Sequence, residues 1–490
     1  ALAASGLFAA ATTATAETIT VCANGCDYTS INDAIEDSSD GDVIQLAAET
    51  YFEGDEINTD GKAITLRGVL DKAGGPASVL FGTSGHRVLR CRSGESGATS
   101  FENLVIRNGS ADVGGGMYNE DGSSPTLTNC TFTLNSASER GGGMHNKDGS
   151  NPTLINCTFT NNSAEYGGGM YNYRSSEPTL DNCTFTSNTA QYGGGMCNLS
   201  DNFGVASGPT LTDCTFTSNS AESGGGMFNQ FDFPTLTDCT FTSNSAEDGG
   251  GMYNNEESSP TLTDCTFTGN SAEYGGGMHN RNSSNPTLTD CTFTGNSAEY
   301  YGGGMRNTGF SSPILTGCTF TSNSAGFGGG GMENSFNTFP TLTNCTFTSN
   351  SADSDSGSGG GMYNLSSVLI LTNCTFTGNS ADQGGGMYNY TGFPTLANCT
   401  FANNSADDGG GMYNTRMSGP ALTDCTFTSN SADIRGGGMY NENSSTPALA
   451  DCTFTGNSAD DGGGMYNTGI SKSTLTDCTF TSNSAEDGGG

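Results

Sequence analysis

The chain has very little positive charge. Its 490 residues include 15 Lys and Arg against 51 Asp and Glu, a formal net charge of −36. Nucleic acids and anionic membranes are bound largely through Lys and Arg, so this composition argues against both as partners. Tryptophan is absent and hydrophobic residues make up only 33%. That content suits a narrow core repeated along the chain. Disorder is the competing interpretation, but the apolar residues keep a strict register.

Long apolar segments are also missing, except at the N-terminus. Residues 1–13 are mostly small and apolar, and Ala14-Thr15-Ala16 follows the small-x-small pattern of a cleavage site. We expect residues 1–16 to be the remnant of a secretory signal peptide, which predicts a secreted or cell-surface protein. No other segment is long and apolar enough for a transmembrane helix. The chain stops at Gly490 in the middle of a repeat, so we expect the natural protein to continue.

One sequence unit dominates the rest of the chain. The tripeptide Cys-Thr-Phe occurs fourteen times, spaced by 25 to 31 residues and mostly by 26 or 27. A period of this length indicates a solenoid, in which one structural unit is stacked many times. The Cys residues of the unit are Cys130, Cys157, Cys183, Cys214, Cys239, Cys265, Cys291, Cys318, Cys345, Cys374, Cys399, Cys425, Cys452 and Cys478.

Alternation within a unit predicts short strands. In residues 157–160, Cys and Phe share one face and the two Thr share the other, so we expect Cys and Phe to be buried. A Leu marks a preceding strand and a Met a following one, with Gly residues at the bend. Three strands and three bends per 26 residues predict a right-handed parallel β-helix, and the density of Thr, Gly and Asn excludes an α-solenoid. The expected inward ladders and the Asn ladder include Cys157, Phe159, Asn162, Met170, Cys265, Phe267, Asn270 and Met278.

The domain organisation follows from the repeats. Residues 17–100 are not repetitive and predict an N-terminal cap with the first irregular coils, including a short helix with Ser30 as N-cap. Residues 101–490 are the β-helix repeats, and in the divergent first one Val105 takes the Phe position. We expect the ladder Cys to be free buried thiols and Cys22 and Cys26 to form a disulfide. The residue after each repeat Met should face outward; it is Cys197 in one coil and His145 or His279 in two others.

Two parts of the chain resemble known families. Phe159-Thr160-Asn161-Asn162 followed by Gly-Gly-Gly-Met resembles the paired repeat motifs of the polymorphic outer membrane proteins and of other right-handed β-helix surface proteins, although Met stands where those motifs often have Ile. Residues 28–35 with residues 41–44 resemble the cap of pectin-lyase-like β-helices. The resemblance implies a secreted or surface-displayed β-helix, often adhesive, and their autotransporter barrel is absent from this sequence.

Outward Thr residues are the first candidate surface. Two Thr flank the Phe in thirteen of the fourteen units, and Ala402 breaks the pattern. Such an array resembles the Thr-x-Thr faces of insect ice-binding solenoids, although Thr also simply favours strands. The array includes Thr158, Thr160, Thr240, Thr242, Thr266, Thr268, Thr292 and Thr294.

Acidic residues are the second candidate. They follow Ser-Ala in most units, so stacking predicts a column of like charges a few ångströms apart. Calcium between coils would relieve that repulsion, although a solvated acidic face needs no ion. The candidate Ca²⁺ ligands are Asp248, Asp407, Asp408, Asp460 and Asp461.

These patterns favour a secreted or cell-surface structural or adhesive scaffold without catalytic residues. Its expected partners are host or environmental surfaces, either polysaccharide or protein, and no cofactor other than Ca²⁺ is predicted. One alternative is an ice-binding solenoid. Another is a polysaccharide-binding or pectin-lyase-like carbohydrate-active protein, but no basic residue recurs near the acids, and Lys occurs only at positions 62, 72, 147 and 472.

Overall fold

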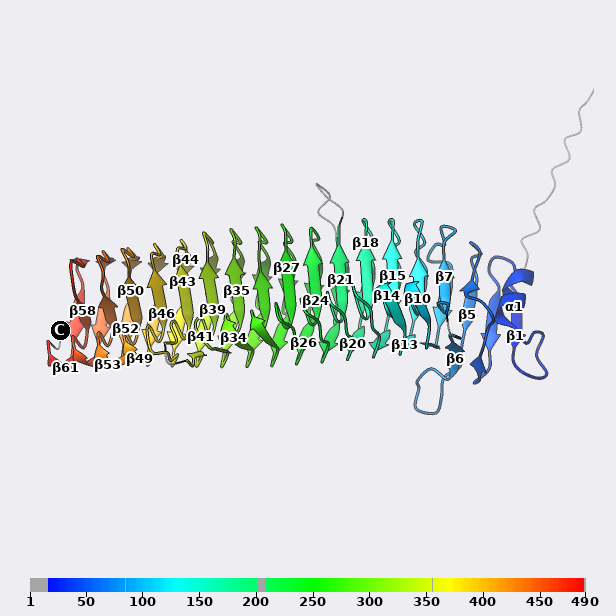
Figure 1. The fold of residues 1–490 in the computed structure, drawn as a ribbon, viewed down its shortest axis with the longest axis horizontal. Helices are drawn as coiled ribbons and strands as arrows, with labels where there is room; N and C mark the ends of the chain where they lie inside the picture. The colour runs from blue at the N-terminus through cyan, green and yellow to red at the C-terminus, as the bar shows by residue number, and fades with distance from the viewer. Residues whose placement is uncertain (1–15, 84, 201–207, 355, 489–490) are drawn as a thin grey trace, which may run out of the picture.

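The computed structural model describes residues 16–83, 85–200, 208–354 and 356–488. It confirms the predicted fold: coils of about 26 residues stack into a straight rod of parallel strands, with one short helix at the N-terminal end (Figure 1). Every pairing between named strands is parallel and joins equivalent strands of neighbouring coils, as β17 (Thr158–Thr160) pairs with β20 (Thr184–Thr186).

Three long stacks of strands form the walls of the rod. The Leu stack is an 18-stranded sheet, the Met stack is a 16-stranded sheet, and the Phe stack lies between them in chain order. A middle coil contributes one strand to each stack: β28 (Thr261–Thr263), β29 (Thr266–Thr268) and β31 (Met278–Asn280). The Leu stack ends at β59 (Thr474–Thr476), the Phe stack at β60 (Thr479–Thr481) and the Met stack at β58 (Met465–Asn467).

A fourth, interrupted stack was not predicted. Short strands form at Ser-Ala, between the Phe strand and the Met strand, where the sequence was expected to bend. The strands are β10 (Ser110–Val113) with β14 (Ser136–Arg140), four from β30 (Ser271–Tyr274) to β42 (Ser351–Ala352), and four from β49 (Ser405–Asp408) to β61 (Ser484–Asp487). Isolated parallel bridges such as Ser163 to Thr189 continue the column between these groups. The coil therefore has four sides in many of its turns.

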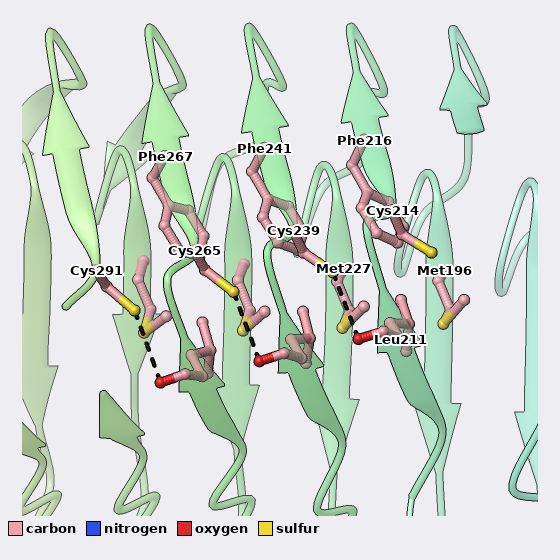
Figure 2. Close-up of a cluster of buried hydrophobic side chains, with 14 of the residues drawn as sticks. Met196, Leu211, Cys214, Phe216, Met227, Cys239, Phe241, Cys265, Phe267 and Cys291 are labelled. Carbon is pink, nitrogen blue, oxygen red and sulfur yellow. Dashed lines mark hydrogen bonds between the residues drawn. The ribbon is translucent and has the colours of Figure 1, made fainter. Parts of the chain in front are cut away.

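Leu, Cys, Phe and Met of the repeats fill the interior, except at the last coil, where Leu475 is exposed. Phe267 is fully buried, and its ring stacks on Phe241 and Phe293 with 4.7 Å between centroids. The Cys265 thiol donates a hydrogen bond to the Leu236 carbonyl of the preceding coil at 3.7 Å, and the same contact repeats along the ladder (Figure 2). All fourteen ladder thiols are free, and each is buried except the half-buried Cys478.

The Asn ladder lies beside the Phe stack and satisfies its own polar groups. Asn270 Nδ2 donates to the Phe241 carbonyl and to Asn296 Oδ1, both at 2.9 Å. Its Oδ1 accepts from the backbone N–H and the side-chain Nδ2 of Asn244. The Asn after Met-Tyr forms a second buried ladder, in which Asn280 donates to Asn307 Oδ1 at 2.8 Å.

The chain bends after the Phe strand, and the residue with left-handed backbone conformation at this bend directly precedes the ladder Asn. Asn161, and not Asn162, has a positive φ of 54°, and Ser or Gly takes that position in other coils. In the first repeat, Ile106 takes the Phe position, because it pairs with Phe132. The prediction that Val105 takes this position was wrong, since Val105 pairs with the outward Thr131.

The residue after Met is buried, which corrects the outward placement of Cys197, His145 and His279. All three are at most 2% exposed. The chain reverses at Gly167, whose positive φ leaves no room for a Cβ against the Met170 carbonyl. This turn brings Tyr166 next to Tyr171. The segment before the Gly run therefore covers the column formed by the residues that follow Met. Alternation along a strand cannot reveal such cover from another segment.

The cap contains α1 (Ile31–Asp37), with Ser30 as N-cap as predicted. Ile31, Ala34 and Ile35 are buried beneath it. Lys62 donates to three carbonyls at the C-terminal end of the helix, where a positive charge is favourable. Cys22 and Cys26 form the expected disulfide. The predicted signal remnant lies outside the described residues except for Ala16.

Candidate binding surfaces

The Phe stack presents two columns of Thr on its outer face. The Phe rings and the strand hydrogen bonds fix the coil spacing, and Thr266 and Thr268 pair in register with Thr292 and Thr294. The two Thr of one strand lie ~6.6 Å apart along the strand. The structure places all eight predicted Thr on this face, and all are half-buried: Thr158, Thr160, Thr240, Thr242, Thr266, Thr268, Thr292 and Thr294.

The adjacent Leu stack carries a second Thr face, which the sequence analysis missed. Thr261 and Thr263 flank the buried Leu262 and pair in register with Thr287 and Thr289. The signal was present as a repeated Thr-Leu-Thr. Two neighbouring walls of the rod therefore offer rows of hydroxyl and methyl groups over many coils.

An acidic corner separates these two Thr faces in the middle of the rod. Asp264 lies between β28 and β29 with a positive φ of 53°, and its side chain is exposed. The same corner holds Asp in four consecutive coils and Gly317 in the next. A Cβ at Gly317 would collide with the carboxylate of Asp290, so this carboxylate extends over the following coil. The corner Asp residues are Asp213, Asp238, Asp264 and Asp290.

The predicted column of acids after Ser-Ala divides into two kinds. Asp407 and Asp460 are exposed and Asp461 is half-buried on the fourth stack. Asp408 instead forms a two-point ion pair with Arg435, with distances of 2.8 and 2.7 Å. No basic partner was predicted there, because Arg435 lies one coil away in sequence.

Asp248 also has a partner, since its Oδ1 lies 3.0 Å from Nδ1 of His279. Burial lowers the pKa of His279 to about 4, although the contact with Asp248 raises it. Burial alone would raise the pKa of Asp248, but His279 and nearby Arg residues outweigh it and the net direction is down. Among the residues that the structure describes, no group of three His, Cys, Asp or Glu side chains is placed to hold a metal ion. Calcium binding stays a prediction.

The column formed by the residues that follow Met includes an ion pair. Arg306 and Glu333 occupy equivalent positions in neighbouring coils, with 3.1 Å between Nε and Oε2. Glu333 is almost fully buried, and the Arg306 guanidinium lies 4.4 Å from the ring centroid of Tyr274. Burial raises the pKa of Glu333, and Arg306 opposes that rise. Aromatic clusters occupy the column on either side of this pair.

An open groove of about 710 Å³ lies near the cap, where the fourth stack begins. Its lining includes Glu56, His86, Arg87, Asp112 and Ser138. Arg87 forms an ion pair with Glu56 at 3.0 Å, so the groove has mixed charge on an otherwise acidic rod. The sequence analysis did not identify these residues, because most of them come from non-repetitive or divergent coils.

No helix in the described part of the chain is long and apolar enough to cross a membrane. A comparison with protein families matches the family described as "Right handed beta helix region" over residues 91–233, 229–367 and 332–490. A search of curated proteins found no match.

Several solved structures match this chain at low similarity. Pectate lyase Pel9A is 12% identical with a TM-score of 0.29, over 77% of this chain and 78% of that one. The tailspike protein gp49 of Acinetobacter baumannii bacteriophage Fri1, a capsular polysaccharide depolymerase, is 12% identical with a TM-score of 0.24, over 73% and 53%. PfbA, a surface adhesin of Streptococcus pneumoniae, is 10% identical with a TM-score of 0.22, over 87% and 86%.

Proposed function

Because the chain belongs to the right-handed β-helix family, whose fold serves many activities, we propose its function from its own surfaces. We propose that it is a secreted or cell-surface scaffold that binds a polysaccharide or protein surface through many coils and without catalysis. We also propose that the chain is related to the polymorphic outer membrane proteins, because it has the Phe-x-x-Asn and Gly-Gly-Gly-Met motifs.

The observation that carries the proposal is the repetition of the Thr columns on two neighbouring walls. A binding wall of this kind offers the same weak contact many times, so its strength depends on the number of coils engaged. A catalytic centre needs a set of different groups at one place, and the groups that recur along these walls are alike.

Removing whole coils tests this proposal. Deletion of residues 265–290 joins Asp264 to Cys291 and removes one coil, while deletion of residues 265–317 joins Asp264 to Cys318 and removes two. We expect saturable binding to a cell or matrix surface that weakens in steps with each coil removed. Circular dichroism controls for the fold.

An enzyme gives the opposite pattern. Release of reducing or unsaturated sugar ends from pectin or a capsular polysaccharide, abolished by replacing Asp407 and Asp408 or by Glu56→Gln in the groove, would contradict the scaffold proposal. Unchanged surface binding after both coil deletions would also contradict it.

Ice binding is the second candidate, favoured by the in-register Thr columns of the Phe stack. The acidic corner beside that face does not fit a flat and uncharged ice surface, so we expect the wild type to show no thermal hysteresis. Faceted ice crystals that are lost in Thr266→Tyr, but kept in the buried-column variant His145→Tyr, would place ice binding first.

A further inference from the structure

One edge of the rod carries an apolar patch. In five consecutive coils, the turn from the Met stack to the Leu stack and the start of the Leu strand expose large apolar side chains. Each is at least 42% exposed. In Figure 1 these turns belong to the upper edge of the rod, from its yellow-green part to its orange part. The patch comprises Phe310, Ile314, Phe336, Phe339, Val368, Ile370, Phe393 and Met417.

The patch is contiguous because the coils keep register through these turns. The backbone N–H of Val368 donates to the Thr338 carbonyl, and that of Phe393 donates to the Ser367 carbonyl. Phe339, Val368 and Phe393 therefore occupy one position in three successive coils. Ile314 and Ile370 both pair with Thr341 on the neighbouring strand. With about 4.8 Å per coil, the patch extends roughly 20 Å along the rod.

The same five turns contain no acidic residue, although the chain has 51. Equivalent turns elsewhere, at residues 120–128, 173–181 and 255–263, each contain two acids. The charge present in the patch segments is Arg416, whose guanidinium lies over the Tyr390 ring. Aromatic residues, Met and Arg with few carboxylates are the composition of a protein interface core.

We propose that this patch is where a second copy of the chain docks, with the two rods side by side and antiparallel. Eight large side chains exposed by about half offer on the order of 700 to 800 Å² per copy, which is what a stable dimer buries per partner. A twofold axis through the middle of the patch places Phe310 of one copy opposite Met417 of the other, so that one surface serves both copies.

Charge favours this occupant. Two copies that each carry −36 repel over most of their surfaces, and the acid-free edge lets apolar surfaces meet with the least like-charge contact. Salt screens the remaining repulsion. The dimer should therefore tighten as the ionic strength rises, whereas a complex with a basic partner weakens.

Sedimentation velocity over a concentration series tests the proposal. We expect a monomer–dimer equilibrium that is shifted at least tenfold toward monomer in the double variant Phe339→Asn with Phe393→Asn. Asn285 already occupies this position in another coil, so the fold accepts it. The matched control is Leu134→Asn, an exposed Leu on a different bend where Asn161 stands in the next coil; it should leave the dimer unchanged.

The orientation is tested by oxidation of the double variant Phe310→Cys with Met417→Cys. It should form covalent dimers, and Phe310→Cys alone should not. A wild type that stays monomeric at all concentrations and salt levels would overturn the proposal, and so would a dimer that the Phe339 and Phe393 changes leave intact. A dimer that weakens as the salt concentration rises would indicate contact between charged surfaces, and this result would also refute the proposal.

Discussion

The Asn ladder offers a test in which neighbouring residues of the same type have opposite roles. Asn404 is buried within the ladder, and Asn403 beside it is exposed with a positive φ of 55°. Ser stands at the position of Asn403 in other coils, for example Ser187 and Ser218. We therefore compare Asn404→Ser with Asn403→Ser.

The magnitude follows from the hydrogen bonds. Asn404 Nδ2 donates to the Phe376 carbonyl at 3.0 Å and to Asn430 Oδ1 at 2.9 Å. Its Oδ1 accepts from the backbone N–H and Nδ2 of Asn379. The shorter Ser side chain cannot span these groups, which leaves two donors on Asn379 and the Phe376 carbonyl without their partner. At about 1 to 1.5 kcal/mol for each of these three buried groups left unsatisfied, the loss is about 3 to 4.5 kcal/mol.

Native-state hydrogen exchange measures this loss locally, which suits a solenoid whose coils can open separately. Exchange of the amides in residues 374–404 should accelerate by about 10² to 10³ in Asn404→Ser, since about 1.4 kcal/mol corresponds to a factor of ten. Asn403→Ser should change exchange there by less than about threefold. Equal effects of the two substitutions would refute the view that the ladder, and not the bend, carries the stability.

Three further changes test the interior. Phe267→Ala should destabilise its coil by about 3 to 5 kcal/mol in denaturant unfolding, because a ring stacked on both sides is removed; a loss below 1 kcal/mol would contradict the rigid core. Burial lowers the pKa of His145 to about 3, below its unfolded value near 6.5, so the folded state binds fewer protons. Stability should therefore fall as the pH drops from 6.5 toward 3, by up to about 5 kcal/mol, and His145→Tyr should remove that share of the slope. Burial raises the pKa of the Cys157 thiol, so it should react with a thiol reagent only after denaturation, while Cys22 and Cys26 should react only after reduction; mass spectrometry distinguishes these cases.

The sequence predicted the features that depend on the repeat and on alternation. Phe267 and Cys265 face inward because a strand alternates, and Ser30 caps a helix because local chemistry decides it. The fourth stack and the buried position of Cys197 depend on how one segment folds over another, and a period along the chain carries no such information. The contact between Asp408 and Arg435 was missed for the same reason.

The buried pair of Arg306 and Glu333 has a consequence for assembly of the rod. Coils this similar could stack on the wrong neighbour with most of their ladders intact, since Phe, Asn and Met would still meet Phe, Asn and Met. A shift by one coil, however, would bury Glu333 without its guanidinium and remove Arg306 from its carboxylate. An uncompensated buried charge costs about 3 to 5 kcal/mol. The pair therefore disfavours incorrect stacking and selects the arrangement in which these two coils are adjacent.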